Sequence, residues 1–271
     1  MELTQKQLEE LKLVETDMLR EYIRVCESLN LQYYVLGGTL LGAVRHQGFI
    51  PWDDDIDVGM PRADYEVFLA KAQELLPKNL FVQTFQTDPE YPANFAKIRN
   101  SNTTFVEDSL RECDINHGVY IDVFPLDFYP QKGKKLLSFR HTLLKLRISD
   151  AYSVEGMKGK TKLVRAMSRI LYPTVKCAVE KRETLMRSFT EGEYLANHCG
   201  AWGAKEIIPA HWYGEGTLMN FEGIQVLAPL CWDEWLTQMY GDYMQLPPVE
   251  KRVAHHYVAA FDLTKPYTER K

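Results

Sequence analysis

The amino-acid sequence predicts an α/β (α+β) fold, a mixed sheet flanked by helices, with a basic helical insertion. Helical and strand periodicities alternate along residues 1–130, and residues 131–190 are basic with apolar residues at helical spacing. The composition is that of a globular protein, because 45% of the 271 residues are hydrophobic and 25% are charged.

The first helix is predicted to run from Thr4 to near Asn30. Thr4 followed by Gln7 fits a capping box, and apolar residues recur behind it at intervals of three and four. A short apolar strand at 33–36 and a second helix at 39–46 follow.

The remaining elements are predicted from the same periodicities. In chain order they are a strand at 53–60, a helix at 63–76, strands at 80–84, 95–99 and 119–124, a hairpin of 217–221 and 224–227, and a helix at 231–240. With no repeat and no low-complexity linker, we expect one compact unit: a catalytic core at 1–130, the insertion at 131–190 and an aromatic-rich C-terminal part at 191–271.

The insertion has 15 Lys/Arg and four Asp/Glu, a net charge of +11. Since the whole chain has a net charge of −5, the rest of the chain carries −16. Its apolar residues predict two helices with one apolar and one cationic face. Such a face can dock on anionic lipid headgroups or on a phosphorylated acceptor. The alternative is a solvated insertion that covers one side of the domain.

The cysteines and the N-terminus indicate a cytosolic protein. The five cysteines form no CxxC pair and are expected to be reduced, and no histidine spacing completes a zinc site. No apolar stretch is long enough to cross a bilayer, and residues 1–13 lack a signal-peptide core. We expect a cytoplasmic location.

An acidic run, Trp52-Asp53-Asp54-Asp55-Ile56-Asp57, is the most specific chemical feature. On a strand, Asp53, Asp55 and Asp57 would project one way and Asp54 the other. Carboxylates about 4 Å apart repel by roughly 4 kcal/mol at an effective dielectric near 20. Oxygen-only ligands of this kind suit Mg²⁺ or Mn²⁺. A solvated or calcium-binding loop is the alternative.

Asp122 is predicted to supply a further ligand from a neighbouring strand. It is a lone carboxylate in the apolar run 120–124, where burial without a counter-charge is unfavourable. With Asp55 and Asp57 it could hold two metals, one at an attacking hydroxyl and one at nucleotide phosphates. A salt-bridged structural aspartate is the alternative.

Gly37-Gly38-Thr39 is the predicted phosphate-facing element. Two glycines between a strand and a helix let backbone amides and the positive helix end approach an anion, and Thr39 can cap the helix or bind an oxygen. The segment matches neither GxGxxG nor the P-loop pattern, so a dinucleotide-binding domain and a P-loop enzyme are disfavoured.

Together these parts resemble the nucleotidyltransferase superfamily, in which Gly-Gly/Ser and a helix precede Asp-x-Asp and a third acid. Within it, residues 37–46 (GGTLLGAVRH) and 48–57 (GFIPWDDDID) resemble the LicD family. Looser similarity extends through 97–99, 120–125 and 240–248. The animal fukutin-related branch has a zinc-binding cysteine set that is absent here, which favours the bacterial branch.

The resemblance implies a metal-dependent transferase that moves phosphocholine from CDP-choline to a sugar hydroxyl of a cell-surface glycan precursor, of teichoic acid, lipopolysaccharide or capsule type, and releases CMP. It implies Mg²⁺ or Mn²⁺ on Asp53, Asp55, Asp57 and Asp122, of which the last three are catalytic. Phosphate contacts are expected from Gly37, Gly38, Thr39, Arg45, Lys97 and Arg99, although Lys97 and Arg99 are equally well explained as ordinary surface cations.

Expected partners are the CDP-alcohol and a glycan acceptor, lipid-linked or free, with peripheral contact at the inner membrane face and no nucleic acid. A choline headgroup needs aromatic rings. Trp202, Trp212 and Tyr213 are the candidates, whereas Trp232 and Trp235 are expected in the core. His255-His256 is interpreted as a structural pair rather than an acceptor or phosphate contact.

Three alternatives stay open. The chain could transfer another CDP-linked alcohol phosphate, such as ribitol or glycerol phosphate. It could be a nucleotide-sugar glycosyltransferase that uses the Asp-x-Asp metal site, although its motif follows only one strand. It could also be a non-enzymatic scaffold that binds a cation and recruits glycan-modifying enzymes.

Overall fold

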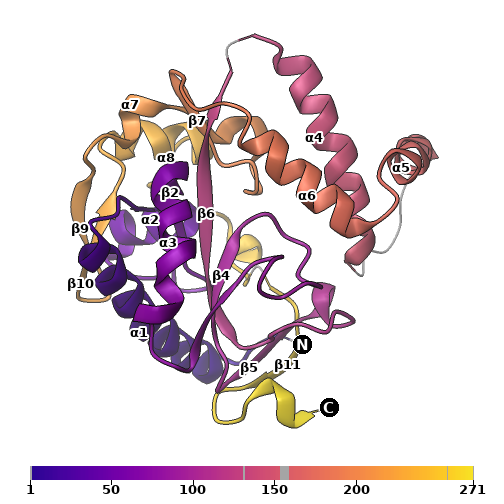
Figure 1. The fold of residues 1–271 in the computed structure, drawn as a ribbon. Coiled ribbons are helices and arrows are strands. Elements are labelled where there is room, and N and C mark those ends of the chain that lie inside the picture. Colours follow the sequence, from indigo (N-terminus) through magenta and orange to yellow (C-terminus); the bar gives the residue numbers. More distant parts are fainter. Residues whose placement is uncertain (1, 131, 153–158, 255, 271) are drawn as a thin grey trace.

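The computed structural model describes residues 2–130, 132–152, 159–254 and 256–270 (Figure 1). Its centre is a mixed sheet with strand order β1-β2-β6-β4-β3, and helices pack on it, which confirms the predicted fold class. Figure 1 shows β6 running through the middle of the molecule, with α1, α2 and α3 to one side and α4, α5 and α6 to the other. In the part of the chain that the structure describes, no helix is long and apolar enough to cross a membrane.

The helices and strands of the N-terminal half form the sheet and its first cover. They are α1 Gln5–Leu29, β1 Tyr34–Val35, α2 Gly37–His46, β2 Asp57–Pro61, α3 Arg62–Leu75, β3 Leu80–Gln83, β4 Ala96–Asn100, β5 Thr104–Glu107 and β6 Val119–Tyr129. The elements of the C-terminal half are α4 Lys134–Ile148, α5 Gly159–Leu171, α6 Val175–Met186, β7 Tyr194–Ala196, β8 Ile207–Pro209, α7 Ala210–Tyr213, β9 Thr217–Phe221, β10 Ile224–Ala228, α8 Trp232–Tyr240 and β11 Val258–Asp262.

Helix α1 forms where the sequence predicts it. Thr4 and Gln7 make the reciprocal hydrogen bonds of a capping box, and Asn30 ends the helix in the left-handed conformation at φ 53°. The hairpin of β9 and β10 is also confirmed, because Phe221 pairs with Ile224 and the turn residues Glu222 and Gly223 both have positive φ.

The register of three central strands sets the site. Strands β2 and β6 are parallel, with Asp57 opposite Asp122, whereas β6 and β4 are antiparallel, with Asp122 opposite Lys97. Residues directly opposite each other in neighbouring strands project to the same face. Asp57, Asp122 and Lys97 therefore form one row across the sheet.

Two predictions about local structure were wrong. The strand expected at 53–60 begins only at Asp57, and residues 53–56 form an irregular loop after a turn at Pro51 and Trp52. Adjacent aspartates repel each other and have low strand propensity, so this segment leaves the sheet. The helix expected at 39–46 begins earlier, at Gly37.

The insertion folds as three described helices rather than the predicted two. Helix α4 packs against α5 and α6, and side chains of α4 and α6 share a small apolar core with Tyr129 of β6 and Ala196 of β7. The larger core lies elsewhere: it joins α1, α2 and α3 to the sheet, the β9–β10 hairpin and α8.

Arg62 connects the two cores. From the start of α3 it donates to both carboxylate oxygens of Asp127 on β6, at 2.7 and 2.8 Å, and to Glu183 on α6 at 2.7 Å. The side chains of Arg62, Asp127 and Glu183 are 15%, 1% and 10% exposed. This network fixes α6, and with it the insertion, to the edge of the sheet.

Replacement of Arg62 by Ala should therefore be strongly destabilising, because it leaves the buried carboxylate of Asp127 without its cation, whereas Glu183 keeps its ion pair with Arg187. We expect the free energy of unfolding in urea to fall by about 3–5 kcal/mol. The matched control is Arg20→Ala, which removes an exposed ion pair with Asp17 and should cost less than about 1 kcal/mol. Equal losses in the two variants would contradict this role.

Candidate active site

The glycine bend lies against the acidic residues. Gly37 follows β1 with φ +52°, and a Cβ built on it would lie 2.8 Å from Asp57 Oδ2. A Cβ on Gly38 would overlap the carboxylate of Asp53. Only glycine allows both the positive φ and these close approaches. The N-terminus of α2 thus meets two carboxylates, whose negative charge its dipole stabilises.

Thr39 does not cap α2, whose N-cap is Leu36. The buried Thr39 hydroxyl instead accepts a hydrogen bond of 2.8 Å from the Asp57 backbone N–H. The bend therefore fixes the first residue of β2, at the point where the metal-binding motif was predicted.

Asp53, Asp54 and Asp55 converge in the irregular loop. One carboxylate oxygen from each lies within 4.8 Å of the others, and among the described residues this is the group close enough to hold a metal ion. It contains Asp54, which was not predicted as a ligand, and does not include the predicted ligands Asp57 and Asp122. The predicted alternation of faces was therefore wrong for Asp54. That side chain is 1% exposed.

His256 compensates part of this charge. Its backbone N–H donates to Asp54 Oδ2 and its Nδ1 lies 3.2 Å from Asp54 Oδ1. Burial lowers the pKa of His256, but the hydrogen bond to Asp54 and the charges of Asp55 and Asp54 outweigh it and raise the pKa to about 10. The ring is thus a cation at neutral pH. Its neighbour His255 lies outside the described residues.

The remaining carboxylates crowd one another. Burial raises the pKa of Asp57, and the charges of Asp55 and Asp122 raise it further. Burial and the charges of Asp55 and Asp54 likewise raise the pKa of Asp53. Each group thus resists ionisation until positive charge is brought to it, which is the behaviour expected of a cation site.

Asp122 has a counter-charge that the sequence did not reveal. Lys97 Nζ lies 2.8 Å from Asp122 Oδ1 and 3.6 Å from Glu107 Oε1, and the ammonium sits 3.3 Å from the centre of the Tyr120 ring. The salt-bridged alternative for Asp122 is therefore part of the structure. Lys97 is 3% exposed, so its charge is directed at the row of Asp57 and Asp122 rather than at solvent.

Arg99 shares the face of Lys97, but it pairs with Glu107 and not with the aspartates. It is fully buried and donates to Gln83 Oε1, to the Gly118 carbonyl and to Glu107 Oε2, at 2.8 to 2.9 Å. All three guanidinium nitrogens thus have partners within the protein. We leave Arg99 out of the proposed phosphate site.

Arg45 stands two turns along α2 from the glycine bend. It donates through Nη1 to the Tyr243 carbonyl at 2.8 Å and through Nε to His46 Nε2 at 3.0 Å. The structure thus brings Gly37, Gly38, Thr39 and Lys97 to the aspartates, and places Arg45 at the periphery.

Two residues near the carboxylates were missed by sequence reasoning. Glu15 on α1 is 2% exposed, its Oε2 has no hydrogen-bond partner, and burial followed by the charge of Asp55 raises its pKa. The sequence could have revealed Glu15, because it lies four residues after Leu11 and three before Met18 and so falls on the apolar face of the helix. Tyr240, at the end of α8, has its pKa raised by burial and then by the charge of Asp57.

The predicted aromatic cage is not assembled as expected. Tyr213 is 2% exposed and accepts from Trp235 Nε1, and Trp212 packs on the large core. Trp202 is 48% exposed and makes an edge contact with Tyr240 at 5.2 Å between ring centroids. Tyr240, whose pKa is raised by burial and by the charge of Asp57, is therefore the aromatic residue near the carboxylates, and Trp202 packs against its ring.

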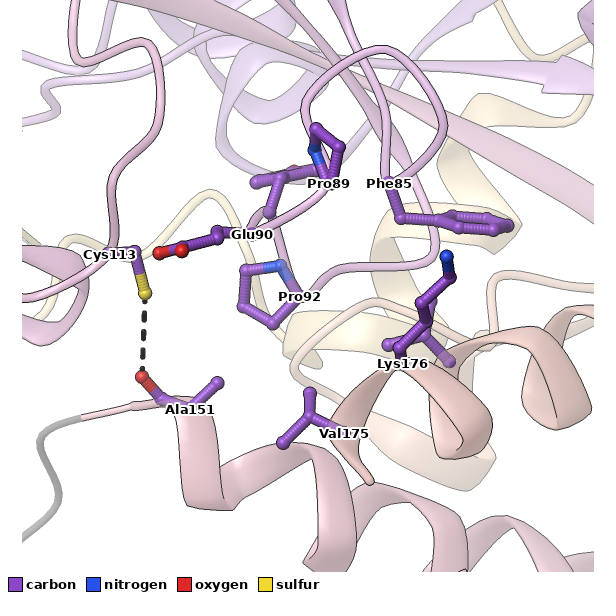
Figure 2. A pocket seen from close by; sticks show the side chains of 10 residues that line it. Phe85, Pro89, Glu90, Pro92, Cys113, Ala151, Val175 and Lys176 are labelled. Carbon is purple, nitrogen blue, oxygen red and sulfur yellow. Dashed lines mark hydrogen bonds between the residues drawn. The ribbon is translucent and has the colours of Figure 1, made fainter. Parts of the chain in front are cut away.

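A separate pocket of about 310 Å³ lies between the loop after β3 and the insertion. Figure 2 shows the labelled side chains that line it: Phe85, Pro89, Glu90, Pro92, Cys113, Ala151, Val175 and Lys176. Tyr91 also lines it, and its ring lies 6.2 Å from that of Phe95, which in turn lies 5.5 Å from Lys97 Nζ. Tyr91 and Phe95 therefore link the pocket to the surroundings of Lys97.

The mixed sheet, the glycine bend and the clustered aspartates define a phosphotransferase with a nucleotidyltransferase fold, in agreement with comparisons to known proteins. The family model described as LicD/FKTN/FKRP, nucleotidyltransferase domain, matches residues 30–144. The lipopolysaccharide cholinephosphotransferase LicD of Haemophilus influenzae is 30% identical over 269 residues, which cover 94% of this chain and 98% of that protein. The chain belongs to the LicD family.

Two animal relatives match a shorter region. Ribitol 5-phosphate transferase FKRP of human is 29% identical over 118 residues, 42% of this chain and 20% of that protein. The mouse protein of the same name is 28% identical over the same length. The similarity to these relatives covers less than half of the chain, whereas the bacterial relative matches nearly all of it.

Replacement of Gly38 by Ala tests the bend. The new methyl group would push the Asp53 carboxylate out of the acidic loop, so we expect Mn²⁺ affinity, measured by electron paramagnetic resonance, to fall at least about tenfold. The circular dichroism spectrum should stay unchanged. Gly192→Ala is the control, since its Cβ would meet neighbours only at 3.4 Å and beyond. Unchanged Mn²⁺ affinity in Gly38→Ala would contradict the assigned geometry.

Proposed function

We propose that the chain transfers phosphocholine from CDP-choline to a sugar hydroxyl of a cell-surface glycan precursor and releases CMP. The observation that carries this proposal is the register of Asp57 with Asp122 beside the loop of Asp53–Asp55. The near full-length similarity to a protein named lipopolysaccharide cholinephosphotransferase supports the choice of alcohol and acceptor class.

The residues fit a Mg²⁺ or Mn²⁺ centre. All the donors are carboxylate oxygens, which these ions prefer, and the raised pKa values of Asp53 and Asp57 support the proposal that a cation is bound there. Asp53, Asp55, Asp57 and Asp122 would hold the metal. When bound, it supplies neutralisation of the diphosphate and polarisation of the acceptor hydroxyl.

The protein's own groups position the reactants. Thr39 and the bend hold Asp57 in place, and the amides at the start of α2 supply positive potential next to the carboxylates. Lys97 is our candidate for a phosphate contact, since its ammonium already faces the row of Asp57 and Asp122. Arg45 would contact the outer part of the donor.

In the reaction, the acceptor hydroxyl loses its proton to a carboxylate of the site, and its oxygen forms a bond to the phosphorus of the choline phosphate. The bond from that phosphorus to the bridging oxygen breaks, and CMP leaves with this oxygen. Phosphoryl transfer of this kind depends on positioning and charge neutralisation rather than on a protein nucleophile. The carboxylates, Lys97 and the N-terminus of α2 are the groups that would position the reactants and neutralise their charge.

Transfer of ribitol phosphate is the second candidate function. It is favoured by the two relatives named ribitol 5-phosphate transferase. Transfer of phosphocholine is favoured by the contact between the rings of Trp202 and Tyr240. A quaternary ammonium is held by ring faces, whereas a polyol needs hydrogen-bonding partners. Glycosyl transfer is not retained, because the chain belongs to a family of phosphotransferases.

The first test replaces Asp55 or Asp57 by Asn. We expect CMP release from CDP-choline with Mg²⁺ to fall at least about 1,000-fold in each variant, because charge neutralisation is the main catalytic contribution available. Asp17→Asn is the control, since the Asp17 side chain is 84% exposed on α1. Activity that survives in both site variants would remove these residues from the mechanism.

The identity of the donor is tested by comparing several CDP-alcohols in the same CMP-release assay. CDP-choline should be turned over faster than CDP-ribitol or CDP-glycerol, with slow donor hydrolysis when no acceptor is present. Preference for CDP-ribitol would replace choline with the second candidate. Absence of CMP release from every CDP-alcohol would contradict the proposed reaction.

A further inference from the structure

Helix α5 of the insertion is oriented opposite to an ordinary surface helix. Leu163, Met167, Ile170 and Leu171 are spaced along one face and are 77%, 38%, 81% and 54% exposed. Ser168, on the other side of the helix, is fully buried. A surface helix normally turns its apolar stripe to the core and its polar side to water.

The cause of this orientation is an ion cluster around Asp150. Arg147 of α4 and Arg165 and Arg169 of α5 all pair with this one carboxylate, which is 11% exposed. Arg147 also donates to the carbonyls of Tyr172 and Pro173 at 2.8 Å, directly after α5. The polar side of α5 is thus held against the protein, and the aliphatic stripe is directed to solvent.

The charge around the stripe selects its partner. Lys162 is exposed, and Arg169 is 58% exposed although it pairs with Asp150, so cations of α5 reach the solvent beside the stripe. The whole insertion carries a net +11. An aliphatic stripe bordered by cations matches a bilayer with anionic headgroups, which offers an apolar interior and negative charge in one plane.

We propose that the outward face of α5 (Leu163, Met167, Ile170 and Leu171) docks on the surface of an anionic lipid bilayer. The aliphatic side chains enter the headgroup region, and the exposed Lys162 and Arg169 contact lipid phosphates. This goes beyond the proposed function and does not depend on it, because binding to vesicles requires no turnover. If the acceptor is lipid-linked, docking holds the enzyme at the surface where that acceptor lies.

The test is co-sedimentation with vesicles. The whole chain should bind vesicles of phosphatidylcholine with phosphatidylglycerol, bind those of phosphatidylcholine alone more weakly, and release with rising salt. The double substitution Leu163→Glu with Ile170→Glu should lower binding to the anionic vesicles at least about tenfold. The uncharged pair Leu163→Ser with Ile170→Ser should lower it in the same direction.

The matched control is Leu13→Glu with Leu218→Glu, since these leucines are 68% and 67% exposed on α1 and β9 and the charge change is the same. It should bind vesicles like the unmodified chain. No binding of the unmodified chain to anionic vesicles, or equal losses in control and α5 variants, would overturn the proposal. So would a dimer in gel filtration that the α5 variants convert to a monomer, because a second copy would then cover the stripe.

Discussion

Asp53, Asp54, Asp55 and Asp57 lie between a turn and a buried strand, and Asp122 stands opposite the last of them in the next strand. Such a concentration of negative charge within a folded core is unfavourable unless positive charge is placed beside it. The surrounding structure supplies that charge from three directions: the N-terminus of α2, Lys97 of β4 and the ring of His256. The compensation is incomplete, because the pKa values of Asp53 and Asp57 remain raised.

The same constraint explains features that are otherwise unrelated. Glycine is required at 37 and 38 because the carboxylates approach the bend too closely for a side chain. Lys97 is buried because Asp122 and Glu107 lie on either side of its ammonium, and Glu107 in turn is held by Arg99. Burial raises the pKa of Glu107, but the charges of Lys97 and Arg99 outweigh it and lower the pKa to about 2. A continuous charge network therefore runs from the sheet interior, through Glu107 and Lys97, to Asp122.

Much of the fold could be predicted from the sequence, because local signals determine it. The capping box of α1 and the turn of the β9–β10 hairpin depend only on residues a few positions apart. The acidic run at 53–57 was recognised for the same reason, but its predicted strand conformation was wrong, since repulsion between neighbouring aspartates outweighs the alternation of a strand. The pairing of Lys97 with Asp122 and of His256 with Asp54, and the approach of Glu15 to the same carboxylates, could not be predicted, because these residues come from distant parts of the chain and meet only in the tertiary structure. The outward stripe of α5 was also hidden, because amphipathic spacing alone does not say which face turns to the protein.

Thermal unfolding with and without Mg²⁺, in the unmodified chain and in Asp57→Asn, tests most directly whether the aspartates hold a cation. A ligand that binds the folded state alone raises the melting temperature. We predict a clear Mg²⁺-dependent rise in the unmodified chain and little or none in the variant. Without Mg²⁺ the variant should melt at the same or a higher temperature, because one repelling carboxylate is gone. The opposite result would be a melting temperature of the unmodified chain that does not change with Mg²⁺, and a variant that melts at a lower temperature. It would show that these aspartates do not hold a cation.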